Sequence, residues 1–426
     1  MEKRKIMKRH PELLIPASSL EVLKTAVVFG ADAVYIGGEA FGLRAKAKNF
    51  SLEEMAEGIR FAHEHEVKVY VTANILAHNA DLDGARTYFQ ELKEIGPDAL
   101  IISDPGMFTI AREVCPEIDI HISTQANNVN YMTFRFWQSQ GATRVVTGRE
   151  LSLKEIREIR DHIPDTLEIE TFVHGAMCIS YSGRCLLSNF FTGRDANRGA
   201  CTHPCRWKYA VVEETRPGEY MPVYENERGT YIFNSKDLCM IEHLPDLIEA
   251  GVDSLKIEGR MKTALYVATV ARTYRKALDD LAESREKYEE NMPWYLDQIS
   301  NCTYRQFTTG FFYGKPDEHA QIYDSNTYVK EYTYLGIVGE RAEDGCCVTE
   351  QRNKFSVGET IEIMKPDGRN VEAVVEAIWG QVPDGSWCSQ ESAPHPKQKL
   401  KIRMSVCPDA FDILRREEAV PEESSI

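Results

Sequence analysis

The eight residues Gly30-Ala-Asp-Ala-Val-Tyr-Ile-Gly37 join a glycine to a short β-branched run, and similar segments recur in the first 260 residues. They begin at Gly96, Gly141 and Gly251, and each follows a charged amphipathic stretch. Glycine tolerates the positive φ that ends many helices, and a short apolar run after it is typical of a buried parallel strand. The repeated unit therefore predicts helices that alternate with parallel strands.

Adding the other short apolar runs gives eight strand candidates, at residues 13–17, 34–36, 68–73, 100–102, 119–124, 145–146, 168–173 and 255–257. Most neighbouring candidates are separated by the length of a strand and a returning helix. We predict an α/β fold, a TIM-like (β/α)8 barrel over residues 8–323, with its chemistry at the carboxyl ends of the strands. A doubly wound open sheet is the rival fold, but no GxGxxG motif follows the first strand.

The regularity of the chain changes at two places. A cysteine-rich excursion at residues 176–250 separates strand 7 from strand 8, and residues 262–300 have helical spacing. From about residue 324, short alternating runs with glycine-containing turns predict a small C-terminal antiparallel β-barrel domain, at 324–408. Residues 409–426 are predicted to form an acidic tail.

Composition limits the possible classes of protein. With 43% hydrophobic residues and no long apolar segment, the chain is expected to be globular and cytoplasmic, without a membrane span. Its 66 acidic residues against 50 lysines and arginines give a net charge of −16. Any contact with nucleic acid must therefore use a local basic patch.

Five of the eleven cysteines lie in the excursion, at positions 178, 185, 201, 205 and 239. Such a density of thiols in a reducing compartment can hold an iron–sulfur cluster or a structural zinc ion. Buried, incidental cysteines are the alternative, and paired CxxC knuckles, the stronger zinc signal, are absent.

The segment from Glu170 to Ser188 matches E-x-F-x-H-G-x-M-C-x-x-x-x-G-x-C-x-L-S at every fixed position. In this it resembles the collagenase-like peptidase family of unassigned catalytic type. The likeness extends from Pro11 to about Lys315, and the C-terminal part resembles the branch of tRNA hydroxylation proteins.

The resemblance implies a [4Fe–4S] cluster and prephenate-dependent hydroxylation of the wobble uridine of tRNA to 5-hydroxyuridine. Carried over by position, the ligands are Cys178, Cys185, Cys201 and Cys239, with Cys205 as the alternative fourth ligand. Relatives act on a ribosomal-RNA cytidine or, with a second subunit of the same family, on quinone precursors. A zinc-bound RNA-binding scaffold is the alternative without catalysis.

A true peptidase is the alternative that the family name suggests. The sequence contains neither an HExxH zinc motif nor a GxSxG nucleophile elbow. His174 lies near Cys178 in sequence, but a cysteine that binds a cluster cannot serve as a nucleophile.

Several charged and polar residues follow the predicted strands. Because prephenate carries two carboxylates, the arginines Arg44, Arg149 and Arg260 are candidate substrate ligands, although each could instead pair with a neighbouring acid. The candidate catalytic residues are His174, Glu258 and Gln125. His121 is expected to be a core residue.

A basic and aromatic set in the excursion is the candidate RNA contact, and it consists of Arg194, Arg198, Arg206, Trp207 and Lys208. Cations suit phosphates, and an aromatic ring suits an unstacked base. These charges could also merely balance the cluster.

Overall fold

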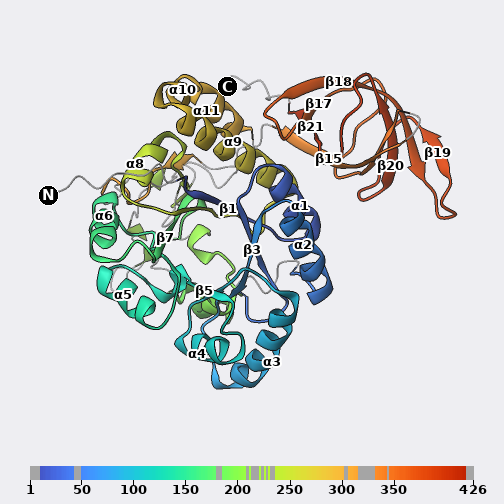
Figure 1. Cartoon of the computed structure of the whole chain (residues 1–426). Coiled ribbons are helices and arrows are strands. Elements are labelled where there is room, and N and C mark those ends of the chain that lie inside the picture. Colours follow the sequence, from blue (N-terminus) through green and yellow to red (C-terminus); the bar gives the residue numbers. More distant parts are fainter. Residues whose placement is uncertain are drawn as a thin grey trace. The chain divides into compact units, whose positions relative to one another are not determined.

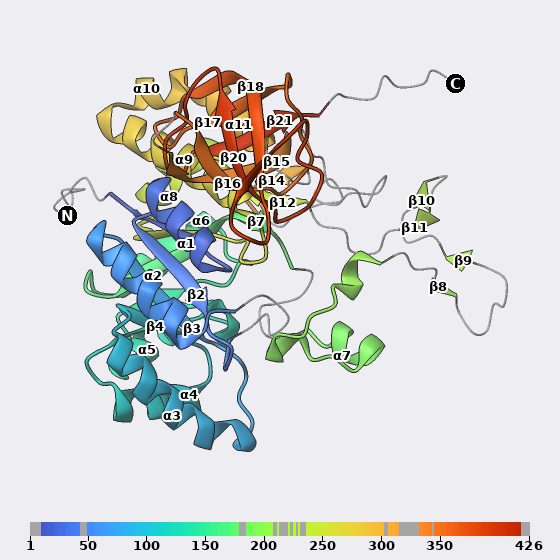
Figure 2. The same cartoon turned by 90° about the vertical axis from the view of Figure 1, so that its right-hand side faces the viewer.

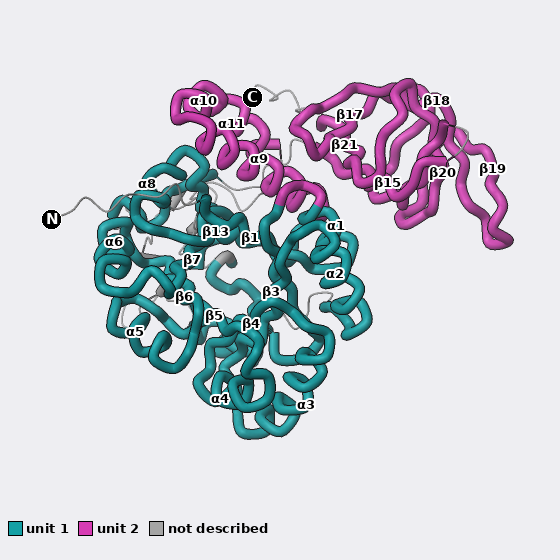
Figure 3. The backbone as a smooth tube through the Cα atoms, viewed as in Figure 1, with its two compact units in different colours: residues 1–27, 31–262, 305–327 teal, residues 28–30, 263–304, 328–426 magenta. Residues whose placement is uncertain are grey.

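The computed structural model describes residues 10–42, 49–178, 185–207, 236–301, 306–314, 332–342 and 345–418, and the backbone of four two-residue strands between 211 and 230. Two compact units divide the chain (Figure 3). Unit 1 comprises residues 1–27, 31–262 and 305–327, and unit 2 comprises residues 28–30, 263–304 and 328–426.

Unit 1 contains a closed barrel of eight parallel strands among the described residues (Figure 1). Each strand pairs with the next, and β13 pairs with both β1 and β7, which closes the ring. The strands are β1 Glu12–Pro16, β2 Ala33–Gly37, β3 Lys68–Ala73, β4 Ala99–Ile102, β5 Asp119–Ile122, β6 Arg144–Val146, β7 Glu168–Ala176 and β13 Ser254–Ile257. The predicted (β/α)8 barrel is confirmed, and every predicted barrel strand overlaps an observed one.

Helices lie outside the strands: α1 Leu20–Val28, α2 Leu52–Glu64, α3 Asn79–Ile95, α4 Pro105–Val114, α5 Tyr131–Ser139, α6 Leu153–His162 and α8 Leu244–Glu249. Local sequence sets their ends. Ser51 and Ser152 form capping boxes, and Gly96 ends α3 with a φ of 68°. Among the described helices, none combines the length and the apolar character needed to cross a membrane.

Two short strands, one from the excursion and one from the segment after residue 305, extend the edge of the barrel. The strand β12, Asp237–Cys239, pairs antiparallel with the end of β7, and β14, Phe307–Thr308, pairs parallel with β12. The described parts of the excursion also contain α7 Leu187–Thr192, 3₁₀ turns at Ala196–Arg198, Pro204–Arg206 and Ile241–His243, and the short strands β8 Val211–Val212, β9 Tyr220–Met221, β10 Glu225–Asn226 and β11 Gly229–Thr230.

A buried charge network fills the barrel near the amino ends of its strands. Arg144 donates to Glu12 at 2.5 Å, to Glu168 at 2.8 Å and to Glu170 at 3.2 Å, although its own side chain is only 4% exposed. Lys256 donates to the second oxygen of Glu170 at 2.7 Å. Glu168 is half-exposed, whereas the other charges of the network are largely buried, and each of them has an oppositely charged partner within the barrel.

The described part of unit 2 contains the helices α9 Ala264–Glu283, α10 Arg285–Glu290 and α11 Met292–Ser300, where the sequence predicts helical spacing over 262–300. Ser284 adopts extended backbone geometry at the end of α9, and its hydroxyl caps α10. The carboxylate of Asp280 accepts hydrogen bonds from Asn291 and Tyr295. These contacts fix α9 against α11.

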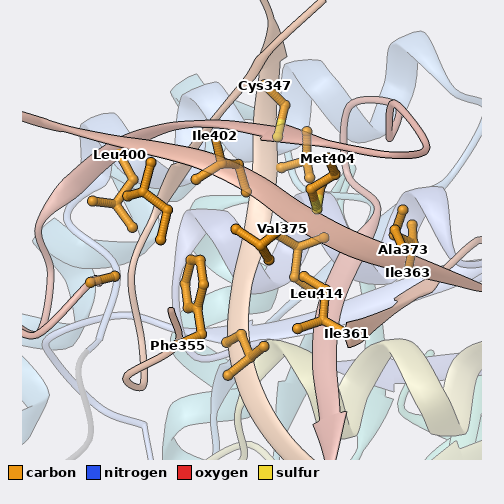
Figure 4. Packing of buried hydrophobic residues seen from close by; sticks show 14 residues of the cluster. Cys347, Phe355, Ile361, Ile363, Ala373, Val375, Leu400, Ile402, Met404 and Leu414 are labelled. Carbon is orange, nitrogen blue, oxygen red and sulfur yellow. The ribbon is translucent and has the colours of Figure 1, made fainter. Parts of the chain in front are cut away.

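The rest of unit 2 is an antiparallel β-barrel, with strands β15 Tyr332–Arg341, β16 Cys347–Glu350, β17 Thr360–Met364, β18 Asn370–Gln381, β19 Trp387–Gln390, β20 Lys399–Met404 and β21 Ile413–Glu417. Pairing of β17 with β18 closes it. Its core includes Phe355, Val375, Ile402 and Leu414 (Figure 4). The predicted small C-terminal antiparallel β-barrel is confirmed.

The end of the chain differs from the prediction of an acidic tail from residue 409. Residues 413–417 form β21, which pairs with β15 and β17. Ile413, Leu414 and Arg415 are fully buried, and Arg415 donates to Glu362 at 2.6 Å. This carboxylate partner allows a charged segment to serve as an inner strand of the sheet.

Candidate functional site

Three predicted site residues meet at the carboxyl ends of β6, β7 and β13. The Glu258 backbone N–H donates to the carbonyl oxygen of His174 at 2.8 Å. The Arg149 guanidinium lies 3.4 Å from a Glu258 carboxylate oxygen and donates to the Ala176 carbonyl at 2.8 Å. Arg149 also lies 3.9 Å from the centre of the Phe172 ring. The structure therefore brings His174, Glu258 and Arg149 together in the region where barrel enzymes carry their active sites.

Gly175 explains why the strand ends can approach so closely. Its φ is 103°, and a Cβ atom there would lie 2.5 Å from the Glu258 carbonyl oxygen. A side chain would therefore be strained by the backbone geometry and would clash with the neighbouring strand end. The glycine of the His-Gly pair in the sequence motif is explained by this contact.

His174 is a buried residue, only 1% exposed. Burial, helped by the positive charge of Lys262, lowers its pKa to about 3. Its imidazole is therefore neutral at physiological pH. A role as a cationic acid or as a base that titrates near pH 7 does not fit this environment.

Both buried histidines of the barrel should make stability depend on pH. Burial, and then the charges of Arg144, Lys256 and Lys68, also lower the pKa of His121 well below 6.5. Below pH 6.5 the unfolded chain binds protons that these folded imidazoles do not, so the free energy of unfolding should fall as the pH drops from about 6.5 toward 3. Denaturant unfolding at pH 7 and pH 5 measures this change.

The matched variants for this experiment are His121→Leu and His395→Gln. His395 is exposed in the C-terminal barrel. His121→Leu should lose part of the wild-type difference between pH 7 and pH 5, whereas His395→Gln should keep it. An unchanged difference in His121→Leu would show that this imidazole is not the source.

Arg260 lies on another part of the same barrel end. It donates to the Thr72 hydroxyl at 2.9 Å, and its side chain is buried. A Cβ atom at Gly37 would lie 2.3 Å from the Arg260 Nη1 atom, so this glycine leaves room for the guanidinium. The sequence did not point to Thr72 as a partner. Arg44, the third candidate arginine, lies outside the described residues.

Gln125 follows β5 in a 3₁₀ turn, Thr124–Ala126, that Ser123 caps. The Gln125 side-chain oxygen is buried and has no hydrogen-bond partner within the described part of the chain. The turn is fixed by the Thr124 hydroxyl, which donates to the Thr147 carbonyl, and by Asn128, which donates to the Val146 carbonyl. Gln125 thus has an unused acceptor on a rigid support.

None of the five candidate ligand cysteines forms a disulfide bond within the described part of the chain. Cys178 is exposed just beyond the end of β7, and Cys239 is buried on β12, opposite His174 in the strand register. Cys185, Cys201 and Cys205 lie in the segment 185–207, where Cys201 Sγ accepts from the His203 N–H at 3.4 Å.

The chemistry of the candidate ligands fits an iron–sulfur site, whereas the positions of the described side chains do not form one. Thiolates are the ligands that hold such clusters, and the excursion supplies one more than a cluster needs. Over the ranges that the structure describes, however, no three side chains of histidine, cysteine, aspartate or glutamate converge as a metal site. The ligand set therefore stays a prediction.

The segment 185–207 is tied to the barrel beside β3. Arg198 donates two hydrogen bonds to Asp81, at 2.8 and 3.0 Å, and the Leu76 N–H donates to the Asn197 carbonyl at 3.2 Å. Figure 2 shows α7 beside this end of the barrel. The hydrogen bonds from Arg198, and then the one from the His78 backbone N–H, lower the pKa of Asp81. Arg198 is thus committed to a structural ion pair, which its position in the sequence could not reveal.

An exposed aromatic row runs along the same segment. Phe190 is 82% exposed, Phe191 47% and Trp207 42%. The Phe190 and Phe191 rings lie 5.2 Å apart, and those of Phe191 and Trp207 lie 6.2 Å apart. Arg194 is exposed on the turn after α7. The two phenylalanines are additions to the predicted RNA contact, while the Arg206 side chain and Lys208 lie outside the described residues.

Comparisons with known proteins cover both parts of the chain. A family model described as peptidase family U32 matches residues 18–322, and one described as the C-terminal domain of peptidase family U32 matches residues 330–415. Together these models account for the barrel and for the C-terminal domain.

Three relatives show the extent of the likeness. Over 402 residues the chain is 41% identical to tRNA hydroxylation protein P1 of Bacillus subtilis (strain 168), covering 94% of this chain and 93% of that protein. Identity to tRNA hydroxylation protein P of Escherichia coli (strain K12) is 42%, covering 86% of this chain and 88% of that one. The 23S rRNA 5-hydroxycytidine C2501 synthase of the same strain is 40% identical over 64% of this chain and 40% of its own length.

Proposed function

Since this chain belongs to peptidase family U32, we propose that it is a tRNA-modifying hydroxylase that converts the wobble uridine to 5-hydroxyuridine. The observation that carries the proposal is 41% identity to a tRNA hydroxylation protein over nearly the full length of both chains. Prephenate as co-substrate and a [4Fe–4S] cluster are parts of the same proposal. The sequence contains neither the zinc motif nor the serine-nucleophile motif that would support peptide hydrolysis.

The arginines at the barrel end support binding of a dicarboxylate. Arg149 is held by the Ala176 carbonyl, by Glu258 and by the face of Phe172, which fixes the plane of its guanidinium. A fixed, planar guanidinium can donate two parallel hydrogen bonds to a carboxylate. Arg260, fixed by Thr72, supplies a second guanidinium at the same end. The two fixed cations match the two carboxylates of prephenate.

The residues proposed to hold the cluster are Cys178, Cys185, Cys201 and Cys239, with Cys205 as the alternative fourth ligand. When bound, a cluster would supply electron-transfer chemistry that no side chain of the barrel provides. The chain's own groups have separate tasks. Arg149 and Arg260 orient the co-substrate, Gln125 can accept a hydrogen bond from it, and the Glu258 carboxylate can accept a proton at the barrel end.

The exposed row of Phe190, Phe191 and Trp207 supports an RNA substrate. Aromatic faces stack on unpaired bases irrespective of sequence, and a wobble base already lies in a loop. Arg194 adds a cation that can contact a phosphate. The sequence favours Arg198 for that task, but its ion pair with Asp81 makes it the anchor of the segment instead.

Nucleoside mass spectrometry of RNA from a strain that lacks this gene tests the proposal. We expect 5-hydroxyuridine in tRNA to fall by about tenfold or more, and wild-type protein to restore it only in cells that make prephenate.

Arg149→Lys should weaken prephenate binding by roughly tenfold to a hundredfold, because lysine cannot form the bidentate contact.

The two RNA classes separate the possible outcomes. A loss of hydroxycytidine from 23S rRNA with normal tRNA would assign the chain to the reaction named for its ribosomal relative. Normal levels of both nucleosides, in a strain with no second enzyme of this kind, would contradict the proposal.

A further inference from the structure

The outer face of the C-terminal β-barrel carries a row of cations on one strand. Along β20, the side chains of Leu400, Ile402 and Met404 point into the core shown in Figure 4. Because neighbouring residues of a strand point to opposite faces, Lys399, Lys401 and Arg403 lie together on the outer face. The pattern of burial along β20 alternates in agreement with this assignment.

Trp379 of β18 lies within this row of cations. It is paired in register with Lys401, and its ring centre lies 5.5 Å from the Lys401 ammonium nitrogen and 5.6 Å from the Arg403 guanidinium carbon. The indole is only partly buried, so part of its surface stays accessible. A cation–aromatic group of this kind keeps the ring in place while its exposed part can contact a ligand.

The charges of this face are only partly balanced. Lys399 and Arg403 are exposed and form no ion pair within the described ranges. Glu350 lies opposite Lys399 in the strand register, but its carboxylate is paired with Arg352 at 2.9 Å. Glu340 lies one strand farther away, opposite Val348. In a chain of net charge −16, three clustered cations mark this face as a place where a polyanion can bind.

We propose that the Trp379 surface, formed by Trp379, Lys399, Lys401 and Arg403, binds the substrate RNA at a site separate from the hydroxylation site. The three cations contact phosphates, and the indole stacks on an unpaired base. The aromatic ring favours nucleic acid over an acidic protein, because a carboxylate chain offers the cations a partner but offers the indole none. The inference rests on the proposed function, since it takes RNA as the substrate.

Binding of unmodified tRNA transcript to the full-length chain, measured over a series of salt concentrations, tests this surface. The triple variant Lys399→Gln, Lys401→Gln, Arg403→Gln should bind roughly 30- to 100-fold more weakly near 0.1 M salt, and the slope of log K against log salt should decrease by about two. Trp379→Leu should bind about tenfold more weakly with an unchanged slope, because it removes stacking and no charge.

A second triple variant controls for net charge. Arg341→Gln, Lys354→Gln and Arg369→Gln remove three cations from elsewhere on the same barrel, where Arg341 and Arg369 are largely exposed. This variant should bind tRNA within about threefold of wild type. Equal weakening by both triple variants would overturn the proposal, and so would poly-glutamate binding that depends on Trp379 as strongly as tRNA binding does.

Hydroxylation in cells separates failure of this inference from failure of the function. If deletion of the gene removes 5-hydroxyuridine while the first triple variant binds tRNA normally, the Trp379 surface is not an RNA-binding site and the proposed function stands. If the wild-type chain neither binds tRNA nor changes its nucleosides, both are overturned. The inference is supported if the first triple variant binds tRNA more weakly and, at limiting expression, also yields less 5-hydroxyuridine in cells.

Discussion

Cys201→Ser protein is expected to contain less than about a fifth of the wild-type iron after anaerobic purification, and cells that depend on it should lose nearly all 5-hydroxyuridine. The reason is the softness of the ligand, since a serine hydroxyl is a poor substitute for the thiolates that hold an iron–sulfur cluster. Iron analysis and the visible absorption spectrum measure the cluster directly, and nucleoside mass spectrometry measures the consequence.

Cys388→Ser is the matched control for this experiment. Cys388 is an exposed thiol on β19 of the C-terminal barrel and is not a candidate ligand. Its replacement should change neither iron nor hydroxylation. Comparing Cys239→Ser with Cys205→Ser then identifies the fourth ligand, which we expect to be Cys239. Full iron content in Cys201→Ser protein would show that Cys201 is not a ligand of the cluster.

Arg144→Met should lower the free energy of unfolding by about 3–5 kcal/mol, because it leaves Glu12 without its cation and Glu170 with Lys256 alone. Glu170 is completely buried, and Glu12 is 15% exposed at its side chain. Burial alone would raise the pKa of Glu12, but the charge and hydrogen bonds of Arg144 lower it overall. Urea unfolding at pH 7 measures the loss.

The same charge network should make the free energy of unfolding depend on pH. Because the pKa of folded Glu12 lies below its usual value of about 4.5, the stability that this carboxylate contributes is present above about pH 4.5 and is lost as the pH falls through the folded pKa. Arg144→Met should lack that part of the acid transition. Arg86→Met is the control, since the Arg86–Glu113 pair is half-exposed and should contribute less than about 1 kcal/mol. Equal losses in the two variants would contradict the role of burial.

The sequence was sufficient to predict the barrel because its signals are local. A glycine such as Gly96 ends a helix, and the next apolar run is buried whatever its distant neighbours are. The same holds for the strands of the C-terminal barrel that alternate clearly. The strand β21 lies in the predicted acidic tail, since Ile413–Glu417 is mostly charged.

The candidate site was less predictable because its contacts join distant parts of the chain. The sequence placed Arg149, Glu258 and His174 at one end of the barrel, where the structure also places them. It could not show that Asp81 holds Arg198, or that burial keeps His174 neutral. Such properties depend on which side chains approach each other in space, and a single sequence does not contain that information.

Arg272 of α9 has a consequence for how the C-terminal barrel can be gained or lost during evolution. This nearly fully buried guanidinium donates to the Lys365 carbonyl at 2.9 Å, to Asn370 at 3.0 Å and to Gln298. A gene truncated after residue 324 would keep Arg272 and its partner Gln298 but lose Lys365 and Asn370. A lineage that discards the barrel would therefore lose the residues that bury Arg272 and most of its hydrogen-bond acceptors, so the selection that keeps an arginine at this position should relax.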